Sequence, residues 1–463
     1  MDVSEGDRTG GIAQTVAGLR RAFASGDTRS LDWRLAQLAR LADLLHEREP
    51  ELREALAADL GRCPLEAWFE LGMLDRQLRH VRRHLRRWAK PERVANPLLT
   101  WPGKGRIVRE PLGVALIIAP WNAPFLLTLG PLIGAIAAGN CAVLKPSEIA
   151  PRSSAALVRL LPEYLDPACF AVVEGAVPET AALLAQRFDH ILFTGSQRVA
   201  RVVMEAAAKR LTPVTLELGG KSPCLVARDA DVRTAARRIA WAKFINAGQI
   251  CIAPDHVLVD ARRRDELLEA LTGAIGDFYG SDPRTSPDFQ RIVNRGHFDR
   301  LTRYLDDGDI VLGGERDADS LFIAPTLMID VPEDAPAMQE EIFGPILPVV
   351  AVPDLEAAID RVNARPRPLT LYLFTNDRAT RRRVIEGTRS GGVCVNDAFV
   401  QLTVPDLPFG GVGASGMGAY QGRWSFETFS HRKAVLDRSS RFDLPVRYPP
   451  YDDRKLRWLR RLM

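Results

Sequence analysis

The chain has 463 residues, 46% of them hydrophobic, and its 62 basic and 58 acidic side chains leave a net charge of +4. This length allows more than one domain, and the near balance of charge argues against a nucleic-acid-binding protein and against an acidic disordered chain. The six cysteines form no CxxC pair and no zinc-type spacing with histidine, so we expect neither a metal site nor a disulfide scaffold. The polar, acidic N-terminus lacks the pattern of a secretory signal, and we expect a cytoplasmic protein.

The first ninety residues are predicted to be helical. Leucines recur there at helical spacing, at Leu31, Leu35, Leu38, Leu41 and Leu45. Pro64 can open a further helix that ends near Lys90. In that helix His80 and His84 stand four residues apart, but the arginines around them would repel a metal cation, so we expect a solvated helix face. The stretch that follows, PERVANPLLTWPGKGRIV, is broken by Pro and Gly and is typical of an arm.

The segment from Pro111 to Leu144 contains no charged residue and is long enough to raise the question of a membrane span. Pro120, Pro124 and Pro131 divide it into short pieces. Strands of a parallel sheet that is covered on both faces are apolar throughout. We therefore predict a buried strand, a loop, a helix and a second strand in place of a membrane span.

Apolar strands alternate with helices from Gly113 onward, in GVALIIA, CAVLKPS, FAVVEG, HILFTG and VTLELG. This alternation predicts a parallel sheet in a doubly wound domain. A second alternation is expected to begin after Cys251, with strands at HVLVD, ILPVVAV, LTLYLFT and GGVCVND and helices near 265–279 and 355–364. The fold class is therefore α/β, with two α/β units.

Three side chains have types suited to covalent catalysis, although each also has a structural interpretation. Cys251 in NAGQICIAP is either a nucleophile or a small buried hydrophobic residue. Glu217 in LTPVTLELGGKSP either caps a strand end or is a buried base with a raised pKa. Asn122 in APWNAPF is either a turn residue or an amide donor that stabilises an oxyanion.

Two further motifs suit a dinucleotide. HILFTGSQRVAR predicts a strand, a turn and a helix, where α/β sheets bind dinucleotides, but Gln197 and Ala200 replace glycines of the GxGxxG fingerprint, and an ordinary turn remains an alternative. Lys145 and Glu148 in VLKPSE either bind ribose hydroxyls or cap a helix. GASGM is not a hydrolase elbow, because Met417 replaces its last glycine.

Taken in order, these motifs resemble the aldehyde dehydrogenase superfamily from Gln14 to Arg447. The motifs that carry the resemblance are APWN, KPSE, FTGS, LELGGKSP, GQICIAP, MQEEIFGP, VND and LPFGGVGASGMG. The segments LPFGGVGASGMGAYQGRWSFETFSH and RYPP are similar to class 3 members, which are dimeric enzymes that oxidise fatty or aromatic aldehydes. The resemblance implies NAD(P)-dependent oxidation of medium- or long-chain aliphatic or aromatic aldehydes to carboxylic acids.

The resemblance also implies a domain plan. It consists of a Rossmann-like NAD(P)-binding domain, a second α/β catalytic domain with the nucleophilic cysteine, a small oligomerisation arm and a basic tail. These parts are expected at 1–90 with 107–218, at 219–400, at 91–106 with 424–445, and at 446–463. The tail DDRKLRWLRRLM is a dimer contact, a frayed terminus or an amphipathic helix on a membrane surface. We expect a homodimer and keep the membrane contact as the less favoured alternative.

Roles at matching positions follow from the same resemblance. Cys251 corresponds to the nucleophile, Asn122 to the oxyanion donor that acts with the Cys251 backbone N–H, and Glu217 to the base that activates water. The expected cofactor is NAD, with NADP as the second choice, and no metal is expected. The residues that correspond to cofactor-binding positions are Trp121, Lys145, Glu148, Gly195, Ser196, Leu218, Glu341 and Phe343.

The chain departs from the family pattern at three places. Ala123 stands where class 3 sequences usually carry Tyr, which predicts a wider pocket, and Ala200 replaces a usual Gly after the pyrophosphate turn. FVQLTVPD lacks a histidine that relatives often have. The alternatives are an acylating dehydrogenase that uses coenzyme A, a non-redox thiol esterase or acyltransferase, and a catalytically silent scaffold. Glu217 argues against the first, the cofactor-side motifs against the second, and the intact catalytic residues against the third.

Overall fold

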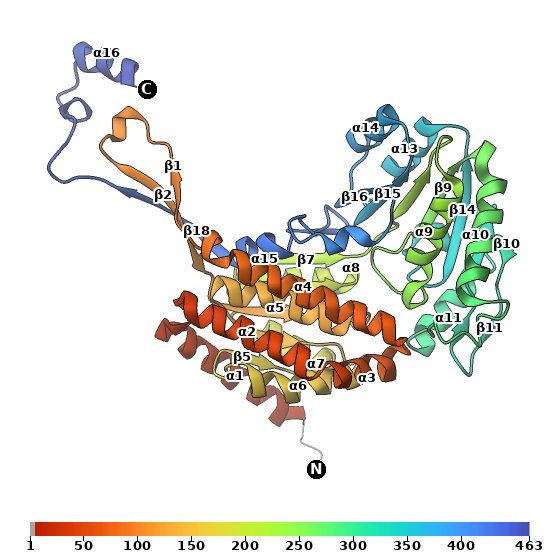
Figure 1. Cartoon of the computed structure of the whole chain (residues 1–463). Coiled ribbons are helices and arrows are strands. Elements are labelled where there is room, and N and C mark those ends of the chain that lie inside the picture. Colours follow the sequence, from red (N-terminus) through yellow and green to blue (C-terminus); the bar gives the residue numbers. More distant parts are fainter. Residues whose placement is uncertain (1–4, 463) are drawn as a thin grey trace.

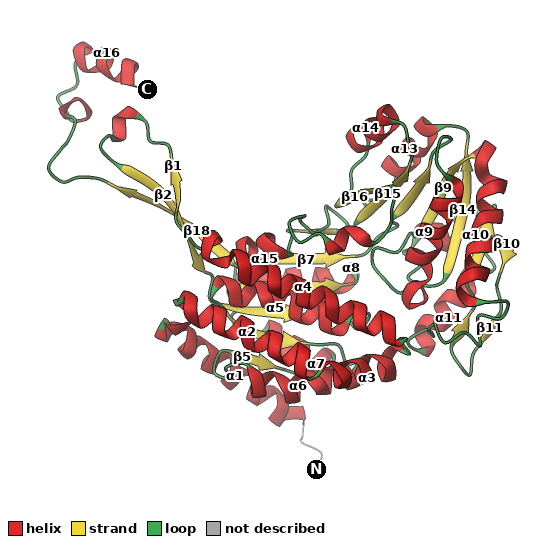
Figure 2. Ribbon diagram, viewed as in Figure 1, coloured by secondary structure: helices red, strands yellow, loops and turns green. Residues whose placement is uncertain are grey.

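The computed structural model describes residues 5–462. Outside the described residues lie residues 1–4, where we expected no secretory signal, and Met463, the last residue of the basic tail. Figure 1 shows two α/β bodies side by side and an arm that projects from the first of them. Figure 2 shows helices flanking the strands of each body.

The first body is built on a six-stranded sheet with the order β17-β7-β6-β3-β4-β5. Only β17 is antiparallel to its neighbour, as expected for a doubly wound sheet with an added edge strand. Its strands are β3 (Val114–Ile118), β4 (Cys141–Lys145), β5 (Phe170–Val172), β6 (His190–Gly195), β7 (Val214–Leu218) and β17 (Gly416–Met417). The predicted apolar strands are confirmed, and every residue of β3 and β4 is buried.

Helices cover this sheet and include the predicted N-terminal ones. The four N-terminal helices are α1 (Glu5–Ser25), α2 (Leu31–Glu47), α3 (Glu49–Leu60) and α4 (Pro64–Trp88), and the later ones are α5 (Pro124–Ala138), α6 (Pro151–Tyr164), α7 (Val177–Leu184) and α8 (Gln197–Ala208). The uncharged segment 111–144 forms β3, α5 and β4, as predicted. Within residues 5–462, no helix has the length and apolar character needed to cross a membrane.

The second body is built on a seven-stranded sheet with the order β10-β13-β14-β9-β8-β15-β16. Its strands are β8 (Pro223–Val226), β9 (His256–Asp260), β10 (Asp309–Leu312), β13 (Thr326–Ile329), β14 (Ile346–Val352), β15 (Thr370–Phe374) and β16 (Gly392–Val395). The other elements of this body are α9 (Val232–Phe244), α10 (Arg264–Tyr279), α11 (Arg295–Tyr304), β11 (Arg316–Asp317), β12 (Phe322–Ile323), α12 (Pro336–Gln339), α13 (Leu355–Asn363) and α14 (Arg378–Gly387).

The expected start of the second α/β unit after Cys251 is wrong. The unit begins at β8, and both β8 and α9 precede the cysteine. β8 is a four-residue apolar run that closely follows the first sheet in sequence, so periodicity gives no sign that it belongs to another sheet. The loop that carries Cys251 therefore lies inside the second body, between α9 and β9.

The arm is a three-stranded antiparallel sheet of β1 (Glu92–Val94), β2 (Lys104–Pro111) and β18 (Ser430–Asp437). β2 extends beyond residue 106 and pairs with β18 along its whole length. The segment 424–445 begins inside α15 (Gly422–Thr428), which packs on α5. The tail forms α16 (Asp453–Leu462) at the far end of the arm (Figure 1).

Candidate active site

Cys251 follows a tight turn between α9 and β9. The turn contains a 3-10 helix (Ile245–Gly248) in which Asn246 and Ala247 have left-handed backbone angles, with φ values of 52° and 50°. Cys251 is partly exposed, whereas the other five cysteines are buried. Its apolar surroundings raise the pKa of the thiol well above its usual range, and the nearby carboxylates of Glu341 and Glu217 raise it further. These surroundings favour the neutral thiol over the thiolate.

Asn122 lies in the loop between β3 and α5 and is buried against the cysteine turn. Its amide donates a hydrogen bond to the carbonyl of Gln249, with an N–O distance of 3.0 Å. The backbone carbonyl of Asn122 accepts from the guanidinium of Arg62 at 2.5 Å and from the side-chain amide of Asn246 at 3.4 Å. Because an amide nitrogen carries two hydrogens, the second N–H of Asn122 is left for a ligand.

Glu217 is buried near the end of β7, where its charge acts on Cys251. Neither of its carboxylate oxygens has a well-formed hydrogen bond to any residue in the described range 5–462. Burial raises the pKa of Glu217 well above 4.5, and the backbone amide of Gly411 opposes this shift only in part. Such a carboxyl group is ready to take a proton from a ligand or a water molecule.

A pocket lies against Cys251 and Asn122. Arg62, Glu66 and Glu70 line one polar wall. The other walls are mainly apolar and include Phe69, Met73, Ala123, Leu126, Ile250, Phe399, Leu402, Phe409 and Tyr420. Ala123 therefore lines the pocket where a larger side chain would reduce its volume.

The cofactor-side candidates of the first body lie at the ends of β4 and β6. Buried Lys145 ends β4, donates to the Pro146 carbonyl at 2.7 Å and pairs with Glu148 at 3.4 Å. Burial lowers the pKa of Lys145, which the Glu148 carboxylate opposes. Gly195 ends β6, and Ser196 is the N-cap of α8, where its hydroxyl accepts from the Val199 amide at 3.4 Å. This arrangement suits a dinucleotide, because a helix N-terminus attracts phosphate and a Lys–Glu pair can bind ribose hydroxyls.

A second set of candidates lies between the bodies. Leu218 ends β7, and the ring of Phe343 packs edge-on against Trp121 with centroids 5.7 Å apart. The Glu341 carboxylate fills the space where a Cβ of Gly219 would lie, so a side chain at this position would displace the carboxylate. Burial raises the pKa of Glu341 to about 8, with a further contribution from Asp255. The aromatic rings of Phe343 and Trp121 suit contact with a nicotinamide ring, and the Glu341 carboxylate can accept hydrogen bonds from the hydroxyls of the nicotinamide ribose.

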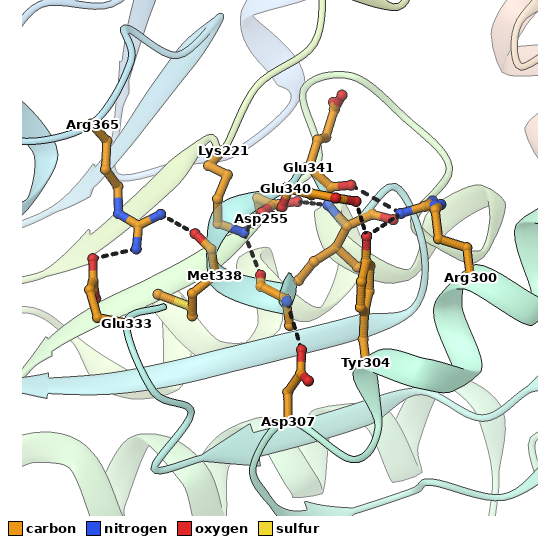
Figure 3. Close-up of polar contacts among 12 residues, drawn as sticks. Lys221, Asp255, Arg300, Tyr304, Asp307, Glu333, Met338, Glu340, Glu341 and Arg365 are labelled. Carbon is orange, nitrogen blue, oxygen red and sulfur yellow. Dashed lines mark hydrogen bonds and ion pairs between the residues drawn. The ribbon is translucent and has the colours of Figure 1, made fainter. Parts of the chain in front are cut away.

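The segment that carries Glu341 and Phe343 is held by basic side chains (Figure 3). We call residues 336–343 the clamped segment. Lys221 pairs with Asp255 and donates to the carbonyls of Ala337 and Glu340 at 2.7 and 3.1 Å. Arg365 donates to the carbonyl of Met338. These bonds fix the beginning of the clamped segment.

Its end is fixed equally well. The guanidinium of Arg300 donates to the carbonyls of Glu341 and Ile342 at 3.2 and 2.8 Å. Asp255 accepts from the Ile342 amide at 2.8 Å. Tyr304 donates to the Glu340 carboxylate at 2.6 Å. The peptide groups that flank Glu341 therefore have little freedom.

Several of these residues were missed in the sequence. Arg62, Glu66 and Glu70 contact the Asn122 loop or the cysteine turn, and Arg300 holds the clamped segment. The only available signal was the i, i+4 spacing of Glu66 and Glu70 on one helix face. Lys221 does lie within the quoted motif LELGGKSP, but the motif does not indicate which groups Lys221 contacts.

His80 and His84, for which the sequence predicted no metal site, form part of an aromatic stack. The rings of His80 and His84 have centroids 4.4 Å apart, and both contact Trp88. His80 also lies 3.1 Å from Asp406. No group of three or more potential metal ligands occurs in the part of the chain that the structure describes.

Known proteins are similar to this chain along nearly its whole length. A family model described as "Aldehyde dehydrogenase family" matches residues 2–435. Aldehyde dehydrogenase family 3 member H1 of Arabidopsis thaliana is 49% identical over 454 residues, which are 97% of this chain and 94% of that protein. The substrate-bound state of Staphylococcus aureus AldH has a TM-score of 0.95 and 42% identity, and the match covers 100% of this chain and 99% of that chain. An NAD-dependent aldehyde dehydrogenase from Sinorhizobium meliloti has a TM-score of 0.87 and 30% identity over 97% of this chain and 89% of that chain.

Proposed function

The chain belongs to the aldehyde dehydrogenase family, and from that premise we propose a role for each side chain of its active site. The enzyme oxidises aldehydes to carboxylic acids with NAD(P) as the acceptor, through a thioester on its cysteine nucleophile. One observation carries the assignment of residues: Cys251 and Asn122 face the same pocket, and the buried carboxylate of Glu217 lies close enough to raise the pKa of the thiol.

In the first half of the reaction, the Cys251 thiol releases its proton to solvent, and the resulting thiolate attacks the aldehyde carbon. The carbonyl oxygen becomes an oxyanion that accepts hydrogen bonds from the Asn122 amide and the Cys251 backbone N–H. A nicotinamide held by Trp121, Leu218, Glu341 and Phe343 would supply the hydride acceptor for this tetrahedral carbon. The carbonyl reforms, and the acyl group remains on Cys251 as a thioester.

In the second half, Glu217 takes a proton from water as the water oxygen attacks the thioester. The oxyanion again lies at Asn122, and its collapse breaks the carbon–sulfur bond. The carboxylic acid leaves, and Cys251 is released as a thiolate. The absence of good hydrogen bonds to Glu217 among the described residues suits this role, because its oxygens are free to face water.

On the cofactor side, Lys145 and Glu148 bind the adenosine ribose, and Gly195 and Ser196 form the pyrophosphate turn. Trp121, Leu218, Glu341 and Phe343 hold the nicotinamide end. The half-exposed Glu148 carboxylate favours NAD, because it accepts from a 2′-hydroxyl and opposes a 2′-phosphate. Buried Ala200 packs within α8 against the core of the first body, so its methyl group is compatible with this turn.

The proposed domain plan matches the two sheets except that residues 107–111 pair with β18 in the arm and that β17 joins the first sheet. Residues 1–90 and 107–218 form the NAD(P)-binding domain and residues 219–400 the catalytic domain. The arm at 91–106 and 424–445 exposes apolar side chains, including Leu98, Trp101 and Leu436, which suits a contact with a second subunit in a cytoplasmic homodimer. In the tail, Leu456 and Trp458 are exposed on α16, and we favour a subunit contact over a membrane surface for them.

An aldehyde panel tests the proposed function. Short aliphatic, long aliphatic and aromatic aldehydes are assayed for cofactor reduction with NAD and then NADP. The apolar pocket predicts preference for medium- to long-chain or aromatic aldehydes, and Cys251→Ser should be nearly inactive because a neutral hydroxyl is a poor nucleophile. Wild-type turnover by Cys251→Ser would refute the mechanism. Free carboxylic acid as the product without coenzyme A excludes the acylating alternative.

The same panel tests the role of Ala123. Ala123→Tyr fills part of the pocket, so we expect the ratio of kcat/KM for bulky over small aldehydes to fall about tenfold. Cofactor KM should not change, because Ala123 lies on the aldehyde side. An unchanged substrate ratio would show that this position does not set the pocket width.

A further inference from the structure

Arg62 connects the start of α4 to the Asn122 loop. Its side chain is 7% exposed, and its guanidinium donates to the Asn122 carbonyl at 2.5 Å and forms an ion pair with buried Glu70. A buried ion pair persists only when further hydrogen bonds satisfy the charged groups. The planar fork of arginine supplies them here, because it reaches a carboxylate and a carbonyl at the same time.

Glu70 extends this connection to α5. One of its oxygens accepts from the backbone amides of Phe125 and Leu126, both at 2.9 Å. These are free amides in the first turn of α5, whose N-cap Ala123 has no side-chain acceptor. Glu70 therefore caps α5 from another helix and is held in place to receive Arg62. The Asn122 loop is fixed at its carbonyl and at the helix that follows.

Glu66, one turn before Glu70, contacts the other half of the proposed oxyanion hole. Its carboxylate accepts a hydrogen bond from the backbone N–H of Asn246 at 3.3 Å, at the left-handed turn that leads to Cys251. Burial raises the pKa of Glu66 to about 7, and the charge of Arg62 opposes the shift. The same end of α4 thus holds the peptide groups on both sides of the site.

We propose that Arg62 is a positioning residue for the oxyanion hole, which acts by holding the Asn122 backbone carbonyl so that the side-chain amide of Asn122 points at the substrate oxygen above Cys251. The inference rests on the proposed role of Asn122. Arg62 is assigned no contact with the reacting atoms and acts through Asn122. A misplacement of a catalytic group by about 1 Å costs roughly 10²-fold in rate, so we expect a modest movement of the Asn122 loop to lower kcat.

A double-mutant cycle tests the proposal. Asn122→Ala alone should lower kcat about 10²–10³-fold. Arg62→Lys keeps a positive charge beside Glu70 but cannot reach both acceptors, and it should lower kcat about tenfold with an unchanged KM for NAD. In the Asn122→Ala background, the same substitution should change kcat less than about twofold, because a residue that acts through Asn122 has nothing left to position.

Arg34 provides a matched control. It is also a buried arginine, and it donates to the carbonyls of Thr28 at 3.1 Å and Ala137 at 3.2 Å, at the opposite end of α5. Arg34→Lys should lower the melting temperature without a change in kcat. An equal loss of kcat from Arg62→Lys in both backgrounds, or no loss in either, overturns the proposal.

Two further results keep the outcomes distinct. If Asn122→Ala itself turns over at the wild-type rate, the oxyanion assignment fails and this inference fails with it. If Asn122→Ala is impaired but Arg62→Lys is additive, only the inference about Arg62 fails. Should Arg62→Lys not fold, Glu70→Gln enters the same cycle, because it weakens the support of Arg62 while keeping an oxygen for the amides of α5.

Discussion

Glu217 and Glu341 are both enclosed carboxylates of one active site, but their surroundings differ. Glu217 lacks well-formed hydrogen bonds to residues 5–462, and burial raises its pKa well above 4.5. Glu341 belongs to the clamped segment, whose peptide groups are bonded to Lys221, Arg300 and Asp255. Burial and the Asp255 carboxylate raise its pKa to about 8, and a hydrogen bond from the Gly220 backbone and the positive charges of Lys221 and Arg300 oppose this rise.

This difference in surroundings suits two different roles, proton transfer and ligand positioning. A buried polar group without partners costs about 1–3 kcal/mol of stability, and such a cost is expected where the group must exchange protons during a reaction. A group on a fully bonded backbone is suited to hold a ligand in one orientation. The difference supports the proposed roles, which are proton transfer for Glu217 and cofactor positioning for the clamped segment.

Glu217→Gln gives the largest expected effect on this comparison. The amide has nearly the same shape but cannot accept a proton, so steady-state turnover should fall about 10²–10⁴-fold. Formation of the thioester does not need the base in its proposed role, and a rapid burst of about one reduced cofactor per active site should remain. Stopped-flow absorbance measures the burst and the later slow phase separately.

Glu341→Gln is the matched control for this experiment. It also replaces a carboxylate by an amide, but on the clamped segment, and it should raise the KM for NAD while the burst and the following phase keep similar relative rates. Loss of the burst in Glu217→Gln would place this residue before the thioester and contradict its assignment to deacylation.

The pH dependence gives the next effect. Because burial raises the folded-state pKa of Glu217 well above 4.5, the deprotonated fraction of the base increases with pH, and kcat should rise by up to about tenfold per pH unit until that pKa is reached. A raised carboxyl pKa also means that wild-type stability falls as pH increases above about 4.5, the ordinary value. Glu217→Gln should flatten both profiles, as measured by pH–rate curves and by urea unfolding.

Arg300→Met tests the other half of the comparison. It removes two hydrogen bonds to the carbonyls of Glu341 and Ile342, so the KM for NAD should rise about tenfold with a smaller change in kcat. Arg365→Met is the control, because Arg365 holds the more distant carbonyl of Met338. An equal rise in KM for the two variants would show that the clamp acts on the segment as a whole and has no specific effect at Glu341.

The sequence predicted the parts of this site that lie within continuous motifs. Apolar runs located β3, β4, β6 and β7, and the family resemblance singled out Cys251 and Glu217. It also identified Glu341 within QEEIFGP. These predictions succeeded for the strands because burial on both faces leaves a local pattern in the chain.

The supporting side chains left no such pattern. Arg62 and Asn122 are 60 positions apart, and Arg300 and Ile342 are 42 apart. Each bond joins a side chain to a backbone carbonyl, which every residue possesses, so the acceptor gives no sequence signal. Only the packing of α4 and α11 against their loops brings these pairs together, and that packing is a property of the fold.

Tyr304→Phe gives the smallest expected effect and separates side-chain from backbone support. Tyr304 donates to the Glu340 carboxylate at 2.6 Å and accepts from Arg300 at 3.1 Å, so its loss removes about 1 kcal/mol while the bonds to the backbone carbonyls remain. We expect a rise of about fivefold or less in the KM for NAD. Burial raises the pKa of Tyr304 to about 12, helped by the bond to Glu340, so the hydroxyl stays protonated and this rise should be constant from pH 6 to about pH 9. A pH-dependent rise would mean that Tyr304 takes part in proton transfer, and the division of roles between the clamped segment and Glu217 would then be wrong.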